Sequence, residues 1–388
     1  MINNNTDYKV LIIGGVHHNT LGVIRSIGKS SFSKKNIFLL IHDCDSCKHE
    51  FLSKSKYIDR ANVFLLESSQ EIFFWIKNSA NILNKCVVIC CSDISSEIIL
   101  SQREKFPSAI ICPSSSMDIS YIMNKHFQSE IARSVGMNVP NDKVINKNES
   151  FLWVDFPCIL KPIKSVCGGG KHDIKFASSY AELQSKISEE LSNTIQIQRF
   201  IKKSMEFQLI GCSLDGGNIV IIPGFTRIIR QRDNTNTGYL KYSKIEELSF
   251  NLDNVKSLLK KFGYSGLFSM EFIRDINGTD YYLETNFRND GNAYCVMSAG
   301  VNLPFIWSYY SVNRELPCQE KVTFDKPVYF MPDLEDIKLG IKSVGLIGWI
   351  KEFLSAKSHS VFDWNDMLPF IFQLYQRCCN RFHRAKNR

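Results

Sequence analysis

The most informative segment of this sequence is Tyr281-Tyr-Leu-Glu284-Thr-Asn286-Phe-Arg288. It follows Phe268-Ser-Met-Glu271-Phe across an Asn277-Gly278 pair, which is typical of the turn between two antiparallel strands. Successive side chains of a strand alternate between its two faces, so Glu284, Asn286 and Arg288 are expected to project together. Pairing of the two strands would place Glu271 beside them.

These side chains suggest a metal site. Mg²⁺ prefers a few hard oxygen ligands and completes its octahedral shell with water and nucleotide phosphates. Glu271, Glu284 and Asn286 supply such oxygens, so the sequence predicts a magnesium site that also holds ATP phosphates, with Mn²⁺ as an alternative metal. A Glu-x-Asn-x-Arg pattern also occurs on solvated strand faces, where Glu and Arg form a surface ion pair. The segments upstream favour the metal site.

Two upstream segments carry groups suited to a nucleotide. An apolar strand ends in Lys161-Pro162 and leads into Ser165-Val-Cys-Gly168-Gly169-Gly170-Lys171. Consecutive glycines let backbone amides approach an anion, and a lysine on the preceding strand can reach phosphate oxygens. The spacing is not that of a P-loop. Further on, the alternating strand 194–201 leads to Glu206, whose carboxylate suits ribose hydroxyls, and the connection could offer backbone groups to an adenine edge.

In this order, the motifs resemble the ATP-grasp superfamily, and most closely its carboxylate-amine ligase branch, related to carbamoyl-phosphate synthase and D-aspartate ligase. The resemblance spans about residues 119–312 and extends more weakly to both ends. It implies an enzyme that uses ATP to join a carboxylate to an amine through an acyl phosphate. Small-molecule carboxylate and amine substrates are then the expected partners, and an amino acid is expected on at least one side.

The resemblance also implies a role for each matching residue. Lys125 and Lys161 would hold the phosphates, beneath a glycine loop that comprises Ser165, Gly168, Gly169 and Gly170. The adenine hinge would be Gln198, Arg199, Phe200 and Ile201, with Glu206 at the ribose. Glu271, Glu284 and Asn286 would ligate one or two magnesium ions, and Arg288 would face the transferred phosphoryl group.

The segment from 224 to 239 departs from the family pattern, because Ile228 stands where related ligases often place a lysine. Arg227 and Arg230 are candidate catalytic residues for binding an anionic substrate, and Arg232 is a third candidate. The alternative is a strand with solvated arginine side chains.

Composition indicates a cytoplasmic enzyme of two or three domains. The 388 residues are 44% hydrophobic, which is enough for full cores, and no uncharged apolar run reaches 18 residues. The N-terminus is polar rather than a signal peptide. The net charge of +8 is spread along the chain without a basic, aromatic-rich face, so no nucleic-acid partner is expected.

The thirteen cysteines are scattered through apolar strands and are expected to be buried and reduced. The spacing in His42-Asp-Cys44-Asp-Ser-Cys47-Lys-His49 could suggest zinc. However, all four ligands would have to converge from one short loop, so we expect a loop without metal.

Strands and helices alternate from Val10 to about Ser116, which predicts a doubly wound α/β domain. The predicted fold class is α/β with an α+β grasp. A pre-ATP-grasp domain (1–117) precedes a two-lobed ATP-grasp domain (118–312) with a lid at about 150–200, and a mainly helical extension follows (313–388).

Alternatives remain open for the packing of the C-terminal extension and for the function of the protein. An apolar stretch from Trp364 to Cys379 runs into a basic cluster, so the tail could pack on its own domain or contact an anionic membrane surface. The sequence also leaves open whether the protein forms a homodimer. Gly14-Gly15 and Asp43 would suit an NAD-dependent oxidoreductase, but Gly-x-Gly-x-x-Gly is absent. A nucleotide-binding module without turnover is the other alternative.

Overall fold

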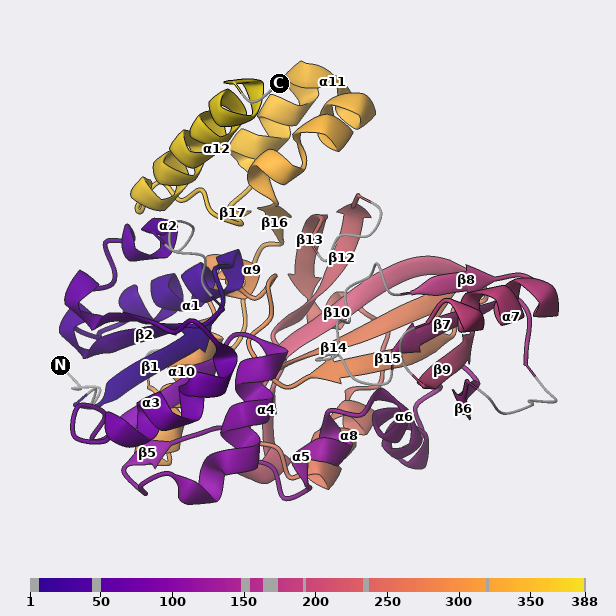
Figure 1. The fold of residues 1–388 in the computed structure, drawn as a ribbon, viewed down its shortest axis with the longest axis horizontal. Coiled ribbons are helices and arrows are strands. Elements are labelled where there is room, and N and C mark those ends of the chain that lie inside the picture. Colours follow the sequence, from indigo (N-terminus) through magenta and orange to yellow (C-terminus); the bar gives the residue numbers. More distant parts are fainter. Residues whose placement is uncertain are drawn as a thin grey trace.

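The structure of the protein is a computed structural model, and it describes residues 7–43, 50–147, 154–162, 174–190, 193–232, 237–318 and 321–386. Three sheets organise these residues (Figure 1). A five-stranded sheet lies at the N-terminal end, a four-stranded sheet forms a separate lobe, and an eight-stranded sheet joins them.

The first sheet is parallel throughout, with strand order β3-β2-β1-β4-β5. Its strands are β1 (Lys9–Gly14), β2 (Ile37–Ile41), β3 (Val63–Leu65), β4 (Cys86–Cys90) and β5 (Ile110–Ile111). The central strands are continuous apolar runs because helices cover both of their faces. Val10 and Ile12 pack toward α1 (His18–Gly28), whereas Leu11 and Ile13 pack toward α3 (Ile72–Asn78) and α4 (Asp93–Gln102). The predicted doubly wound domain is confirmed.

Two helices, α5 (Ile119–Ile122) and α6 (Lys125–Ser134), follow the first domain. Asn124 separates them, because its side-chain oxygen accepts the backbone N–H groups of His126 and Phe127 and so starts a new helix. Lys125 is therefore the first residue of α6, at the edge of the cavity described below.

The four-stranded sheet forms the lid lobe, with strand order β6-β9-β7-β8. Its elements are β6 (Asp142–Asn146), β7 (Cys158–Pro162), β8 (Lys175–Ala177), α7 (Tyr180–Ser188) and β9 (Thr194–Arg199). Leu160, Ile195 and Ile197 pack against Leu183 and Ile187 of α7 in a small core of their own. Lys161 and Gln196 are paired in the register of β7 and β9, so they share the face opposite to this core.

The eight-stranded sheet has the order β15-β14-β10-β12-β13-β16-β17, and β11 pairs with β10. Its strands are β10 (Lys203–Leu214), β11 (Ile219–Ile221), β12 (Gly224–Arg230), β13 (Tyr239–Lys244), β14 (Gly266–Asp275), β15 (Asp280–Asn286), β16 (Val328–Met331) and β17 (Ser358–His359). Helix α8 (Leu252–Phe262) packs with α5 and α6 on the core of this lobe. The expected hairpin is confirmed, because β14 and β15 are antiparallel and Glu271 lies directly opposite Glu284.

The C-terminal part of the chain packs against the N-terminal domain and extends the central sheet. Helices α9 (Tyr294–Ala299) and α10 (Leu303–Asn313) pack beside α1, and β16 and β17 extend the central sheet. Two longer helices, α11 (Ile337–Ser355) and α12 (Leu368–Lys386), lie at one end of the molecule, where α12 contacts the short helix α2 (Glu50–Ser53) (Figure 1). The domain limits at 117 and 312 stay predictions. None of the described helices combines the length and the apolar character needed to cross a bilayer.

The cysteines that the structure describes carry free thiols. Cys86, Cys90 and Cys158 are buried in strands, as expected, and Cys91 is buried directly after β4, whereas Cys318 and Cys378 are exposed. Residues 44–49, which include most of the candidate zinc loop, lie outside the described part of the chain. His42 is described, and its Nε2 lies 2.9 Å from Ser92 Oγ. Within the described residues, no three His, Cys, Asp or Glu side chains are grouped to hold a metal.

Candidate active site

A cavity of about 390 Å³ lies where the three sheets meet. The five-stranded domain contributes the loops after β1 and β4, α6 contributes Lys125, the lid contributes Lys161, and the central sheet contributes one face of β10, β12, β14 and β15. The register puts these strand residues on one face, since Gln208 pairs with both Thr226 and Glu271, and Glu271 pairs with Glu284. We call this cavity the cleft.

The alternation predicted for the hairpin is confirmed. Glu284, Asn286 and Arg288 all line the cleft. Thr285 and Phe287, between them, are buried on the other side, where Phe287 belongs to the core of the central lobe. Together with Glu271, the three polar side chains place two carboxylates, an amide and a guanidinium on one wall.

Two lysines face this wall from different elements. Lys125 Nζ lies 2.6 Å from Glu284 Oε2. Burial would lower the pKa of Lys125, but the charge of Glu284 and the hydrogen bond to it raise the pKa above the usual value. Lys161 is only 8% exposed, and burial together with the nearby charge of Lys125 lowers its pKa to about 8. The two ammonium groups are therefore close enough to influence each other, and an anion bound between them would favour the charged form of Lys161.

Glu271, Glu284 and Asn286 form a compact oxygen-rich group. Asn286 Nδ2 lies 3.4 Å from Glu271 Oε1, and Glu271 is the cross-strand neighbour of Glu284. Burial would raise the pKa of Glu284, but Lys125 and the more distant Lys161 hold it below its ordinary value, so this carboxylate is ionised. The ammonium of Lys125 already provides a cation for Glu284. These residues fit a Mg²⁺ ion that shares its ligands with phosphates.

Arg288 is held by carboxylates from two lobes. Its Nε donates to Asp93 Oδ1 at 3.0 Å, at the start of α4, and its NH1 lies 3.3 Å from Asp290 Oδ2. Burial would lower the pKa of Arg288, but Asp93 and Asp290 raise it, so the guanidinium stays charged. The two carboxylates fix its orientation toward the cleft.

Asp290 anchors a polar network that the sequence analysis missed. Its Oδ2 accepts hydrogen bonds from Gln208 Nε2 at 2.9 Å and from Ser269 Oγ at 3.0 Å, and its Oδ1 accepts the backbone N–H of Asn292 at 2.8 Å. Asp290 continues the two-residue spacing of Glu284, Asn286 and Arg288, and that spacing was the available signal. Gln208 and Asp93 had no comparable signal, because only the strand register and the domain packing bring them here.

The adenine hinge predicted at 198–201 lies at the end of β9. Gln198 is buried, Arg199 and Phe200 are exposed, and Ile201 is half-buried. Two buried atoms on the lid face that carries Lys161, Gln196 Oε1 and Gln198 Nε2, have no hydrogen-bond partner within the described chain. One unpaired acceptor and one unpaired donor suit the edge of a nucleobase.

Glu206 lines the cleft near this end. The predicted glycine loop lies outside the described residues, including Ser165, Gly168, Gly169 and Gly170. Its place over the phosphates therefore stays a prediction.

Arg227 and Arg230 do not line the cleft, so their role as catalytic residues stays a prediction. Thr226 and Ile228 face the cleft, so the alternation of β12 turns Arg227 to the opposite, exposed side. A bulge between Ile228 and Arg230 then re-aims the strand. Arg230 is buried and pairs with Asp336 at 2.6 Å and with Glu352 at 2.7 Å.

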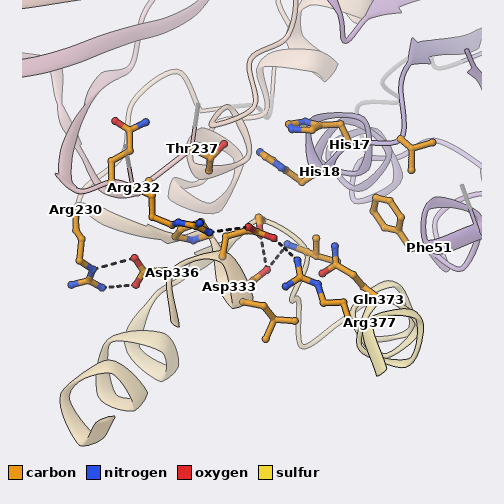
Figure 2. A pocket seen from close by; sticks show the side chains of 18 residues that line it. His17, His18, Phe51, Arg230, Arg232, Thr237, Asp333, Asp336, Gln373 and Arg377 are labelled. Carbon is orange, nitrogen blue, oxygen red and sulfur yellow. Dashed lines mark hydrogen bonds and ion pairs between the residues drawn. The ribbon is translucent and has the colours of Figure 1, made fainter. Parts of the chain in front are cut away.

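A second cavity, also of about 390 Å³, adjoins the cleft, and His17 and Thr237 line both (Figure 2). Figure 2 shows Arg230 turned toward Asp336 on one side of this cavity. His17 and His18 lie on another side of it. Arg232 and Arg377 contribute positive charge, each within reach of Glu335. His18 Nε2 is buried without a hydrogen-bond partner in the described chain, and burial and its neighbour His17 lower the pKa of His18. We call this cavity the side chamber.

Comparison with solved structures shows what fold surrounds the cleft. No protein-family model and no curated protein sequence matches this chain. The biotin carboxylase domain of Hydrogenobacter thermophilus 2-oxoglutarate carboxylase, solved with MgADP and bicarbonate, superposes with a TM-score of 0.63 at 16% identity. The match covers 83% of this chain and 74% of that one.

Two further structures are similar over most of the chain. N5-carboxyaminoimidazole synthase from Aspergillus clavatus, in complex with ADP and its aminoimidazole ribonucleotide, has a TM-score of 0.60 at 13% identity, covering 83% of this chain and 81% of its own. L-amino acid ligase from Bacillus licheniformis has a TM-score of 0.56 at 13% identity, covering 79% and 74%. The chain has the ATP-grasp fold. The cleft lies between the lid and the central sheet, beside the N-terminal domain.

Proposed function

We propose that this ATP-grasp chain is an ATP-dependent carboxylate-amine ligase that works through an acyl phosphate. One observation carries the proposal. Six polar side chains from four separate parts of the chain line a single cavity, namely Lys125, Lys161, Glu271, Glu284, Asn286 and Arg288. The similar structures are those of a ligase, a synthase and a carboxylase domain, two of them bound to ADP, which supports the same class of chemistry.

ATP would lie with its adenine against the lid and its phosphates between the two lysines. The unpaired atoms of Gln196 and Gln198 would meet the base, and Glu206 the ribose. Lys161 is buried with a lowered pKa, and no direct ion pair joins it to another described residue, so a polyphosphate would supply a close anionic partner. Glu271, Glu284 and Asn286 would hold Mg²⁺, which when bound neutralises phosphate charge and orients the phosphates.

The first chemical step would transfer a phosphoryl group. A carboxylate oxygen of the substrate attacks the γ-phosphorus, and the bond from that phosphorus to the β–γ bridging oxygen breaks. ADP leaves with the electron pair, and the substrate becomes an acyl phosphate. Such transfers need positioning and charge neutralisation more than covalent help, and Lys161 and Arg288 are placed to supply both.

The second step would form the amide. The lone pair of a neutral amine attacks the acyl carbon, the carbon–oxygen bond to phosphate breaks, and inorganic phosphate leaves with that electron pair. The amine nitrogen loses one proton to solvent or to a basic group. Arg288, held in place by Asp93 and Asp290, would stabilise the negative oxygen of the tetrahedral intermediate.

The side chamber supports a place for a second substrate. It meets the cleft at His17 and Thr237, and it carries cationic and acidic side chains, including Arg232 and Glu335. A wall with both signs of charge suits an amino acid, which carries both signs itself. The sequence of the segment 224–239, which departs from the family pattern, contributes Arg230, Gln231, Arg232, Thr237 and Gly238 to this chamber.

The test is phosphate release from ATP and Mg²⁺ across a matrix of amino acids and other carboxylic acids, with mass spectrometry of the products. A ligase gives phosphate and ADP in equal amounts with an amide product, and only when both substrates are present. ATP binding without ADP release over the whole matrix would instead support a binding module without turnover. Tight NAD binding without ATP turnover would favour the oxidoreductase alternative.

A further inference from the structure

The helix pair α11 and α12 exposes an unusual amount of apolar surface. Of the 27 large hydrophobic side chains that are exposed in the described chain, twelve lie between residues 341 and 375. That segment is less than a tenth of the protein, so the concentration is local. Contiguous apolar surface of this kind marks an interaction site more often than scattered single residues do.

The spacing of these residues is that of a helix face turned outward. Along α12 the exposed residues Leu368, Ile371, Leu374 and Tyr375 recur every three or four positions, while Phe370 and Phe372 pack against the core. In the second half of α11, Ile347, Ile350 and Leu354 repeat the pattern. An ordinary surface helix turns its polar side to water and its apolar side to the core. Here an apolar stripe of each helix faces solvent.

The two helices form one unit. The ring of Phe353 in α11 contacts Phe362, and Phe362 contacts Phe370 of α12. The ring centroids are 5.3 Å apart in both contacts. Figure 1 shows the pair at one end of the molecule, beyond β16 and β17. Gly345 breaks α11 with a φ of 74°, and every residue from 341 to 347 is exposed around this break. The break therefore forms an apolar tip with Val344, Leu346 and Ile347.

Exposed basic residues occur in the same segment as these apolar residues. Lys338, Lys342 and Lys351 lie on α11 and Lys357 follows it, and none of the four forms an ion pair with any described residue. The acidic residue of α11, Glu352, is already bound to Arg230. The surface is thus apolar and positively charged, which is the combination that anionic lipid headgroups attract. A symmetric contact with a second copy would bring the same positive charges together, which disfavours self-association.

We propose that α11 and α12 dock the protein on an anionic membrane surface, with their apolar stripes in the interfacial layer and the lysines at the headgroups. This binding goes beyond the proposed ligase function and does not depend on it. The helices would lie on the membrane rather than cross it, since no described helix is long and apolar enough to span a bilayer. The side chamber is lined by Gln373 and Arg377 of α12, so docking would also bring that chamber close to the lipid surface.

The test is flotation of the full chain with vesicles of phosphatidylcholine alone or of phosphatidylcholine with a quarter phosphatidylglycerol. We expect binding to the anionic vesicles that weakens as salt is raised. Ile347→Asp, at a side chain that is 72% exposed, should lower the partition coefficient at least about tenfold, and Lys342→Ala about fivefold. Ile276→Asp is the matched control, because Ile276 is 63% exposed in the β14–β15 hairpin and should not affect binding.

Three results would overturn the proposal: no vesicle binding by the unchanged chain, equal binding with and without anionic lipid, or an equal loss in the Ile276→Asp control. Sedimentation velocity distinguishes the competing occupant. A dimer of the unchanged chain that dissociates in Ile347→Asp, without vesicle binding, would show that the surface joins two copies. ATP binding measured on each variant reports the cleft separately, so failure of docking and failure of the ligase proposal can be told apart.

Discussion

At the scale of single residues, Lys161 connects burial to nucleotide binding. Its pKa is lowered to about 8 by burial and by Lys125, so the free protein loses this charge above about pH 8. A bound triphosphate would favour the charged form and raise the pKa again. We predict that ATP binding takes up close to one proton near pH 9 and almost none at pH 7, where Lys161 is already protonated. Affinity should accordingly fall as pH rises above about 8.

Calorimetry in two buffers of different ionisation enthalpy measures this uptake directly. Lys161→Arg is the control, because a guanidinium stays charged throughout this range and should abolish the difference between buffers. Identical heats for the unchanged protein in both buffers at pH 9 would show that Lys161 does not meet the phosphates.

Glu284 and Asn286 carry the predicted metal site. Glu284→Gln keeps the shape of the side chain but removes its charge, and Asn286→Ala removes an oxygen ligand. Each should lower Mg²⁺-dependent ADP formation by at least about a hundredfold, because the main role of such a metal site is to neutralise charge. Circular dichroism should show an unchanged fold. Undiminished turnover in both variants would rule out the metal assignment.

Arg288 should act on the reaction more than on ATP binding. Arg288→Ala removes a buried guanidinium from the cleft, and we expect kcat to fall by about a hundredfold or more while the affinity for ATP changes little. Steady-state kinetics with equilibrium ATP binding separates the two quantities. A loss confined to ATP affinity would remove Arg288 from the transition state and assign it to the ground-state complex.

How far the sequence predicted the site depended on the kind of signal each residue offered. Glu284, Asn286 and Arg288 share a strand, so period-two spacing was sufficient to bring them together. The sequence did not indicate that Arg227 turns away from the cleft, because spacing alone does not tell which face of a strand meets it. The pairing of Arg230 with Asp336 was not predictable either, because the two residues lie 106 positions apart. Long-range pairings of this kind are visible only in the fold.

At the scale of elements, the position of β15 depends on Gln128 of α6. Gln128 Oε1 accepts the backbone N–H of Thr285 at 2.7 Å and the hydroxyl of Tyr282 at 2.9 Å, and its Nε2 donates to the carbonyl oxygens of Thr285 and Ile122. All of these groups are buried. The helix thus satisfies backbone groups of the strand that carries Glu284.

Gln128→Leu should leave several buried polar groups unpaired and lower the free energy of unfolding by about 2–4 kcal/mol. Urea denaturation measures the loss. Glu130→Gln, on the exposed side of the same helix, is the control and should shift the midpoint little. If Gln128→Leu were as stable as the control, water would have to form the hydrogen bonds that the Gln128 amide makes. The position of β15 would then not depend on α6.

The elements themselves were predictable where local signals were strong. The apolar runs of β1, β2 and β4 and the Asn-Gly turn of the hairpin indicated their structure directly. The mainly helical extension was predicted, but the bounds of α11 were not, because Gly345 interrupts this helix and its exposed apolar residues do not follow the usual inward stripe. The break before α6 depended on a single capping side chain, Asn124, within an otherwise helical stretch.

At the scale of the whole molecule, one buried ion pair ties the C-terminal extension to the N-terminal domain. Arg25 of α1 is fully buried, and its Nε donates to Asp366 Oδ2 at 2.9 Å. Asp366 also accepts from Ser55 Oγ at 2.7 Å and from the backbone N–H of Lys56 at 2.9 Å. Nothing in the local sequence around either residue indicated this pairing across 341 positions.

Removing one partner of a buried pair leaves the other charge uncompensated. Asp366→Ala should therefore lower the free energy of unfolding by about 3–5 kcal/mol, measured by urea denaturation. Asp253→Ala removes the exposed pair with Lys256 and should leave the midpoint nearly unchanged. The double variant Arg25→Met with Asp366→Leu should recover much of the loss, because apolar residues of similar volume can replace a buried pair. If the double variant were as unstable as Asp366→Ala, the loss would come from the contacts to Ser55 and Lys56 instead of the charge on Arg25.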